Sequence, residues 1–286
     1  MSALLRRSGA CWRMIVSLAL LSPVSPLLPE PATAAFDLDA ATPAPRACSS
    51  PEVLGLADGS VSDIYHPPPG SGPACVVGAC GYRPFGVDGI EVITARGRLA
   101  LSGGGVGLSF SYVGLAAPGY AEHAFSASLG ISRGPLWLQP GLRLGQFGAS
   151  GDYGGRAVMF DFLAYSYVAP GLRLAFEVEN AFASGLGVQG GAVPSRLRAG
   201  IGYAVLRAVA CGISIEKGNG LRTAVRTGIE WRVTSGVSLR LGSCTFPREF
   251  SLGLGLSIRG LSLDLSSSAN IDLGLTHVAG IAYRWN

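Results

Sequence analysis

Residues 221–233 read Leu-Arg-Thr-Ala-Val-Arg-Thr-Gly-Ile-Glu-Trp-Arg-Val, and this stretch decides the fold. Every second position, from Leu221 to Val233, is apolar or threonine, while the positions between carry Arg, Ala, Gly or Glu. Successive side chains of a β-strand point to opposite faces, so strict alternation over this length predicts a strand with one apolar and one polar face.

The same alternation recurs along most of the chain, for example at 172–178, 250–258 and 261–265. Counting such segments predicts fourteen strands, with twelve as the alternative. They lie near 74–82, 89–101, 104–114, 120–131, 135–147, 155–168, 171–182, 195–206, 208–216, 219–233, 236–244, 249–259, 260–268 and 274–285. Their lengths suit tilted membrane strands of roughly 9–11 residues, some of which project beyond the bilayer.

The connections between these segments alternate in predicted length. Short connections fall at 102–103, 132–134, 169–170, 207, 234–235 and 259–260. The others, at 83–88, 115–119, 148–154, 183–194, 245–248 and 269–273, are longer, with 217–218 as an exception. Short turns at one end and longer loops at the other are typical of bacterial outer-membrane barrels.

The composition agrees with a wall between lipid and water. Charged residues make up 14% of the chain, against roughly 25% in soluble domains. An open sheet edge in lipid would expose a row of unpaired backbone groups, and closure removes it. The sequence therefore predicts an all-β, closed antiparallel transmembrane barrel in a bacterial outer membrane, crossing the lipid many times.

Three segments divide the chain. Residues 1–35 read as a signal peptide, with Arg6 and Arg7 before an apolar run at 14–21 and small residues at 32–34. Residues 36–73 are rich in proline and are expected to form a short irregular segment in the periplasm or the barrel lumen. The barrel is expected over 74–286, ending on an amphipathic strand with Tyr283 and Trp285.

Aromatic residues near the strand ends suggest an interfacial girdle, although scattered packing aromatics are an alternative. The set comprises Tyr112, Tyr120, Trp137, Phe147, Tyr153, Tyr167, Phe182, Trp231, Phe246 and Phe250.

The strand parity also predicts which charged side chains line the lumen. They are Arg173, Glu177, Glu179, Arg196, Arg198, Arg222, Arg226, Glu230, Arg232, Arg240 and Asp264, together with Arg143, Arg259 and Arg284. Arginines outnumber acids in this set, and a lining of one sign would favour anionic ligands. The other interpretation, which we prefer, is a polar interior whose ion pairs are structural.

Five cysteines follow the predicted cleavage site, so at least one has no partner within the chain. Cys75 and Cys80 are close enough in sequence for a small disulfide loop, which the sequence leaves open.

The sequence offers no sign of catalysis. His66, His123 and His277 lie in separate segments without metal-ligand spacing, and no nucleophile elbow or phosphate loop is present. We therefore expect no enzyme, no metal and no cofactor. The arginines are scattered singly rather than clustered, which argues against a nucleic-acid partner.

Residues 55–70 read Gly-Leu-Ala-Asp-Gly-Ser-Val-Ser-Asp-Ile-Tyr-His-Pro-Pro-Pro-Gly. This stretch resembles the Ala-Asp and Tyr-x-Asn-Pro-Ala-Gly pattern of the FadL-like and PorV/PorQ-like superfamily, although His66 and Pro68 depart from it. The cadence of residues 221–285 is similar to the same superfamily, which contains long-chain fatty-acid transporters and type IX secretion shuttle proteins.

The resemblance implies transport of a hydrophobic or amphipathic solute through the outer membrane. A non-transporting shuttle that binds exported proteins, and a purely structural surface protein, are the alternatives. Expected partners are outer-membrane lipid and either a hydrophobic ligand or an exported protein.

Overall fold

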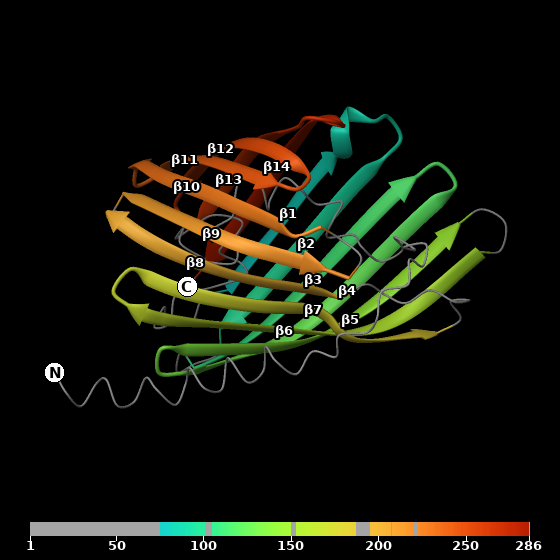
Figure 1. The fold of residues 1–286 in the computed structure, drawn as a ribbon, viewed down its shortest axis with the longest axis horizontal. Helices are drawn as coiled ribbons and strands as arrows, with labels where there is room; N and C mark the ends of the chain where they lie inside the picture. Colours follow the sequence, from blue (N-terminus) through green and yellow to red (C-terminus); the bar gives the residue numbers. More distant parts are fainter. Residues whose placement is uncertain are drawn as a thin grey trace. The chain divides into compact units, whose positions relative to one another are not determined.

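The computed structural model describes residues 75–100, 105–149, 153–186, 195–206, 208–219 and 222–285. The predicted signal peptide and the proline-rich segment lie outside these residues. Fourteen antiparallel strands form one closed barrel in which each strand pairs with its neighbours in sequence, and β1 pairs with β14 (Figure 1). The prediction of fourteen strands is confirmed, and twelve is excluded.

The strands follow the predicted segments closely. They are β1 (Cys75–Arg83), β2 (Glu91–Ala100), β3 (Val106–Ala117), β4 (Tyr120–Arg133), β5 (Leu136–Ala149), β6 (Tyr153–Ala169), β7 (Leu172–Leu186), β8 (Arg196–Leu206), β9 (Val209–Gly218), β10 (Ala224–Thr234), β11 (Val237–Thr245), β12 (Arg248–Ile258), β13 (Leu261–Asn270) and β14 (Gly274–Trp285). One 3₁₀ turn, η2 (Pro84–Gly86), follows β1.

Closure depends on the pairing of β1 with β14. Nine consecutive pairs run from Cys75 opposite Trp285 to Arg83 opposite His277 without a break in register. The two strands that would otherwise be sheet edges, β1 and β14, thus pair with each other, so no unpaired edge faces lipid.

The alternation in sequence becomes an inside and an outside. Along β12, Phe250 and Leu252 are 64% and 57% exposed, while Ser251 between them is 6% exposed. Similar apolar side chains cover the outer face of the other strands, including Ile93, Phe125, Leu144, Ile201, Ile229 and Leu265. An exposed apolar band of this extent is what a surface in contact with lipid requires.

The predicted alternation of connection lengths is partly wrong. The β3–β4 connection is only Pro118–Gly119 and the β11–β12 connection only Phe246–Pro247, because the flanking strands run further than their patterns suggested. At the other end, five residues rather than two separate β2 from β3. Three longer connections remain, at 84–90, 187–195 and 219–223. All three lie at one end of the barrel, opposite the end where β1 begins and β14 finishes.

The aromatic girdle is also partly wrong. Trp137 and Tyr167 belong to an interior cluster, and Phe147 lies opposite the buried Glu122, which places it on the inner face. Tyr120, which hydrogen-bonds to Glu122, also faces inward. Phe182, Trp231 and Phe250 do face outward, each more than half exposed.

No disulfide joins Cys75 to Cys80 in the structure. They lie five residues apart on β1, which at about 3.3 Å per residue is roughly 17 Å, well beyond the Cα separation that a disulfide spans.

Candidate functional site

The inner face of the barrel is the candidate site, because strand alternation directs most buried charged side chains there. Their positions are set by parity: on β10, Glu230 is 2% exposed while its neighbours Ile229 and Trp231 are each 51% exposed. Four groups of side chains line this face and differ in chemistry.

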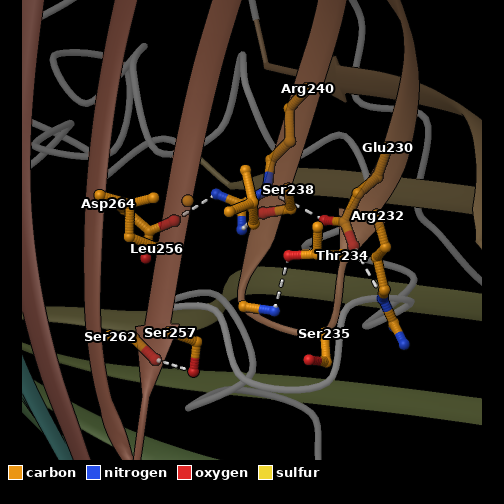
Figure 2. A pocket seen from close by; sticks show the side chains of 13 residues that line it. Glu230, Arg232, Thr234, Ser235, Ser238, Arg240, Leu256, Ser257, Ser262 and Asp264 are labelled. Carbon is orange, nitrogen blue, oxygen red and sulfur yellow. Dashed lines mark hydrogen bonds and ion pairs between the residues drawn. The ribbon is translucent and has the colours of Figure 1, made fainter.

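The first group is centred on Arg240 of β11. Its guanidinium binds Glu230 of β10 at 2.9 Å and reaches across β12 to Asp264 of β13 at 2.5 Å (Figure 2). The crossing is possible because Gly255 of β12 has no side chain: a Cβ there would lie 2.9 Å from Arg240 Nη2 and 3.0 Å from Asp264 Oδ1. Arg232 adds a longer contact of 3.5 Å to Glu230.

A small, polar pocket lies beside this group, and serine, threonine and charged side chains make up most of its lining. Its lining includes Thr234, Ser235, Ser238, Ser257 and Ser262 (Figure 2). Its volume is about 30 Å³, enough for one or two water molecules. The pocket therefore accommodates water rather than a solute.

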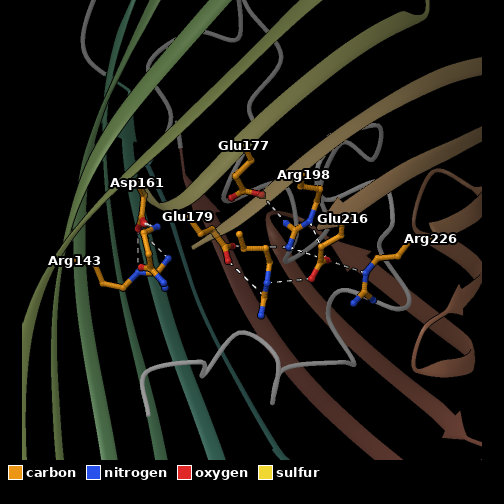
Figure 3. Close-up of polar contacts among 9 residues, drawn as sticks. Arg143, Asp161, Glu177, Glu179, Arg198, Glu216 and Arg226 are labelled. Atoms are coloured by element: carbon orange, nitrogen blue, oxygen red, sulfur yellow. Dashed lines mark hydrogen bonds and ion pairs between the residues drawn. The ribbon is translucent and has the colours of Figure 1, made fainter. Parts of the chain in front are cut away.

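The second group, which we call the Glu216 network, joins four consecutive strands. It contains Glu177 and Glu179 of β7, Arg196 and Arg198 of β8, Glu216 of β9 and Arg226 of β10 (Figure 3). Glu216 contacts all three arginines: Arg196 Nε at 3.1 Å, Arg198 Nη2 at 3.3 Å and Arg226 Nε at 3.2 Å. Arg198 also binds Glu177 at 2.6 Å, and Arg196 lies 3.5 Å from Glu179.

A separate ion pair marks an irregularity in the wall. Arg143 of β5 binds Asp161 of β6 at 2.9 Å (Figure 3), and Asp161 also accepts the backbone N–H of Asn180 at 2.8 Å. The β6–β7 register shifts here, between Phe160 and Phe162, and Asn180 adopts a positive φ of 54°. The Asp161 carboxylate thus satisfies a backbone donor that the bulge removes from the ladder.

The third group combines aromatic rings with arginines. It lies near the end of the barrel where β1 begins and β14 finishes. Trp137 stacks on Tyr165 with ring centroids 6.0 Å apart, and Tyr165 meets Tyr167 edge-on. Arg173 lies 4.6 Å from the centre of the Tyr167 ring, and Arg98 lies 5.6 Å from that of Trp137. These cation–π contacts hold the guanidinium groups against aromatic faces.

The fourth group is apolar. Cys80, Tyr82, Val92, Val113, Ala124 and Val278 form one buried cluster on β1–β4 and β14, with Leu115 packed against it. The inner face is therefore amphipathic: β14 and β1–β4 supply the apolar cluster together with Arg98 and Glu122, β5–β7 add aromatic rings and the Arg143–Asp161 pair, and β7–β13 carry the two charged networks.

The structure places twelve of the fourteen predicted charged residues on the inner face. Ten belong to the networks or contacts above, Arg173 to the aromatic group, and Arg284 is half-buried on the inner side of β14. Arg222 and Arg259 do not belong there: Arg222 precedes β10 and lies exposed over the Phe246 ring, and Arg259 is in the exposed β12–β13 turn.

The sequence reasoning missed several interior charges, notably Arg98, Glu122, Asp161, Glu216 and Glu249. Parity was the available signal: Ile213 and Ile215 are exposed, so Ser214 and Glu216 had to face inward. With these acids counted, carboxylates nearly balance arginines inside the barrel. The hypothesis of a one-sign lining is therefore not supported, and an interior of paired charges fits better.

Within the described residues, no group of three or more His, Cys, Asp or Glu side chains could hold a metal ion. The same residues include no helix that is long and apolar enough to cross a membrane.

The fold is similar to solved structures of outer-membrane proteins. The Pseudomonas putida toluene transporter TodX shares 8% identity with this chain at a TM-score of 0.50, covering 81% of this chain and 92% of TodX. A TodX deltaS2 mutant, described as a monoaromatic hydrocarbon channel, shares 8% identity at 0.53, covering 80% and 92%. The Acinetobacter baumannii outer membrane protein Omp33 shares 10% identity at 0.49, covering 74% and 98%.

The closed antiparallel β-barrel and the likeness to TodX define the class as a barrel of the kind found in outer-membrane channels. The likenesses to solved structures are likenesses of fold, since sequence identity is about one residue in ten. No protein-family model and no curated protein sequence matches the chain.

Proposed function

We propose that this chain is an outer-membrane channel for a hydrophobic or amphipathic solute, related to the FadL-like superfamily that its sequence resembles. The observation that supports this most is the amphipathic inner face. The apolar cluster around Val92 and Val113 and the Trp137–Tyr165 stack lie on β14 and β1–β7, while the two charged networks lie on β7–β13.

An inner face of this kind suits a solute with an apolar body and a polar end. Aromatic rings bind flat or chain-like apolar groups, and arginines bind polar head groups. Trp137 and Tyr165 are 3% and 2% exposed, so a solute would reach these rings by displacing what packs on them. The likeness to TodX, described as a toluene transporter, agrees with this proposal at the level of fold.

Proteoliposomes provide the test. We expect purified barrel to admit naphthalenesulfonate, an amphipathic aromatic anion that crosses lipid slowly, and to give discrete single-channel conductance in planar bilayers. Trp137→Leu should slow naphthalenesulfonate entry about threefold or more, because an aromatic contact contributes roughly 0.5–1.5 kcal/mol. Its conductance for small ions should change little.

Phe125→Leu is the matched control, because Phe125 is an aromatic residue on the outer face, 57% exposed. It should leave both measurements unchanged. A folded barrel that neither conducts nor admits the probe would overturn the transport proposal and favour the shuttle or the structural surface protein.

A further inference from the structure

The Glu216 network balances its charges, with three arginines facing three glutamates. All six side chains are largely removed from solvent: the arginines are 6–13% exposed and the glutamates 7–24%. Buried charges in such a setting need partners, because an isolated one is costly to remove from water.

The network lies near one mouth of the barrel. Glu216 is two residues from the end of β9 at Gly218, Arg226 is two residues from the start of β10 at Ala224, and Arg196 begins β8. These strand ends adjoin the longer connections at 187–195 and 219–223. Longer loops face the outside in outer-membrane barrels, so this mouth is the outer one in the proposed orientation.

Glu216 holds the central position, because its two carboxylate oxygens reach arginines on both neighbouring strands. Arg196 and Arg198 approach from β8 and Arg226 from β10. Glu179 contacts Arg196 and Arg198, and Glu177 contacts Arg198. Neutralising Glu216 alone therefore leaves the network with one excess positive charge on the inner face.

We infer that Glu216 sets the ion selectivity of the channel, because its carboxylate completes the charge balance of the Glu216 network at the outer mouth. The inference rests on the proposed channel function. A fixed unit charge at a channel mouth enriches ions of the opposite sign and repels ions of its own sign. At about 6–8 Å in water, the interaction changes each ion's local concentration roughly two- to threefold.

Reversal potentials in a KCl gradient measure this directly, using full-length barrels in planar bilayers. Glu216→Gln should raise the anion-to-cation permeability ratio by about four- to ninefold. Arg198→Gln should lower it by a similar factor. The double variant has the same net charge as the wild type and should return the ratio close to the wild-type value.

The two single variants should shift the permeability ratio in opposite directions. A loss of packing would not do so, and the comparison therefore separates a role in selectivity from a purely structural one. The Arg143–Asp161 pair and Glu249 also face the interior, but every variant leaves them unchanged. Glu91→Gln is the control: it removes the same charge from a side chain that pairs with Arg83 on the outer face of β2, next to the inward-facing Val92, and should leave the ratio unchanged.

Heat modifiability on mildly denaturing gels confirms that each variant is folded. If Glu216→Gln does not fold, Glu177→Gln provides the same charge change at a more exposed carboxylate that binds Arg198. A conducting wild type whose permeability ratio is the same in all folded variants would overturn the inference alone. A folded wild type without conductance would overturn both the inference and the channel function.

Discussion

At the scale of single residues, the inner face depends on where side chains are missing as much as on where they are present. Arg240 can bridge from β11 to β13 only because Gly255 leaves the intervening strand bare. Trp137 lies flat over Gly130 in the same manner, its ring occupying the space of the absent side chain. Glycine in these strands thus creates room for a neighbour's large side chain.

Gly255→Ala should destabilise the barrel by about 1–3 kcal/mol, the usual cost of overpacking. The new methyl group would collide with Ser238 Oγ and lie 2.9 Å from Arg240 Nη2, so the Arg240–Asp264 ion pair would have to shift. Denaturant unfolding of the barrel in lipid vesicles measures the loss. Gly148→Ala is the control, because nothing lies within 4 Å of its Cβ position. Equal stability of the two variants would contradict the role assigned to Gly255.

At the scale of elements, the tight hairpins show what sequence alternation cannot specify. Arg259 and Gly260 connect β12 to β13 with positive φ angles of 51° and 87°. Two left-handed residues in succession match the right-handed twist of the paired strands, and this geometry favours Asn-Gly. Arginine at the first position therefore carries a backbone cost.

Arg259→Asn should stabilise the barrel by about 1 kcal/mol, because asparagine tolerates the left-handed region better than arginine does. Arg259 is exposed, so the substitution disturbs little packing. Gly260→Ala should have the opposite effect, since its Cβ would collide with the backbone carbonyl of Arg284 at a φ of 87°. Denaturant unfolding of the barrel in lipid vesicles measures both changes. A loss of stability in Arg259→Asn would show that the arginine makes a contact that outweighs its strain.

The contrast between strands and turns explains how much of the fold and of the inner face could be predicted from the sequence. Alternation fixed the number and faces of the strands, because period two is imposed by the backbone itself. It placed Glu177, Arg198 and Arg240 inward correctly, since parity needs no knowledge of neighbours. The lengths of turns such as Pro118–Gly119 could not be read, because apolar residues extend through both strand and turn.

Contacts between side chains on different strands could not be predicted from the sequence. That Glu216 meets Arg196, Arg198 and Arg226 depends on strand register, which a single strand's pattern does not contain. The interior position of Trp137 was missed for a related reason. An aromatic residue near a strand end can lie either at the membrane interface or on the inner wall. Trp137 is placed on the inner wall by its pairing opposite Tyr165 and by its contact with Gly130, which the sequence does not show.

At the scale of the whole molecule, the closed sheet and the apolar outer band together indicate a wall that faces lipid, and neither feature does so alone. A closed sheet with water on both sides would need no ring of exposed Leu, Ile and Phe, while an open sheet with this band would expose unpaired backbone to lipid. The combination implies two different solvents on the two faces. It also predicts that tolerance of an outward charge depends on its depth in the wall.

Leu252→Arg, near the middle of β12, should therefore cost about 2–4 kcal/mol of folding stability in a bilayer. Ile258→Arg, at the end of the same strand, should cost about 0–1 kcal/mol, because an arginine there reaches the interfacial water. Both side chains are exposed, at 57% and 71%, so neither substitution removes much protein packing. Denaturant titration of barrels folded into vesicles compares the two variants on one strand. A barrel whose outer face meets water would tolerate both arginines equally, so equal costs would argue against a lipid-facing band, whereas a steep loss at Leu252 alone would locate the bilayer midplane on β12.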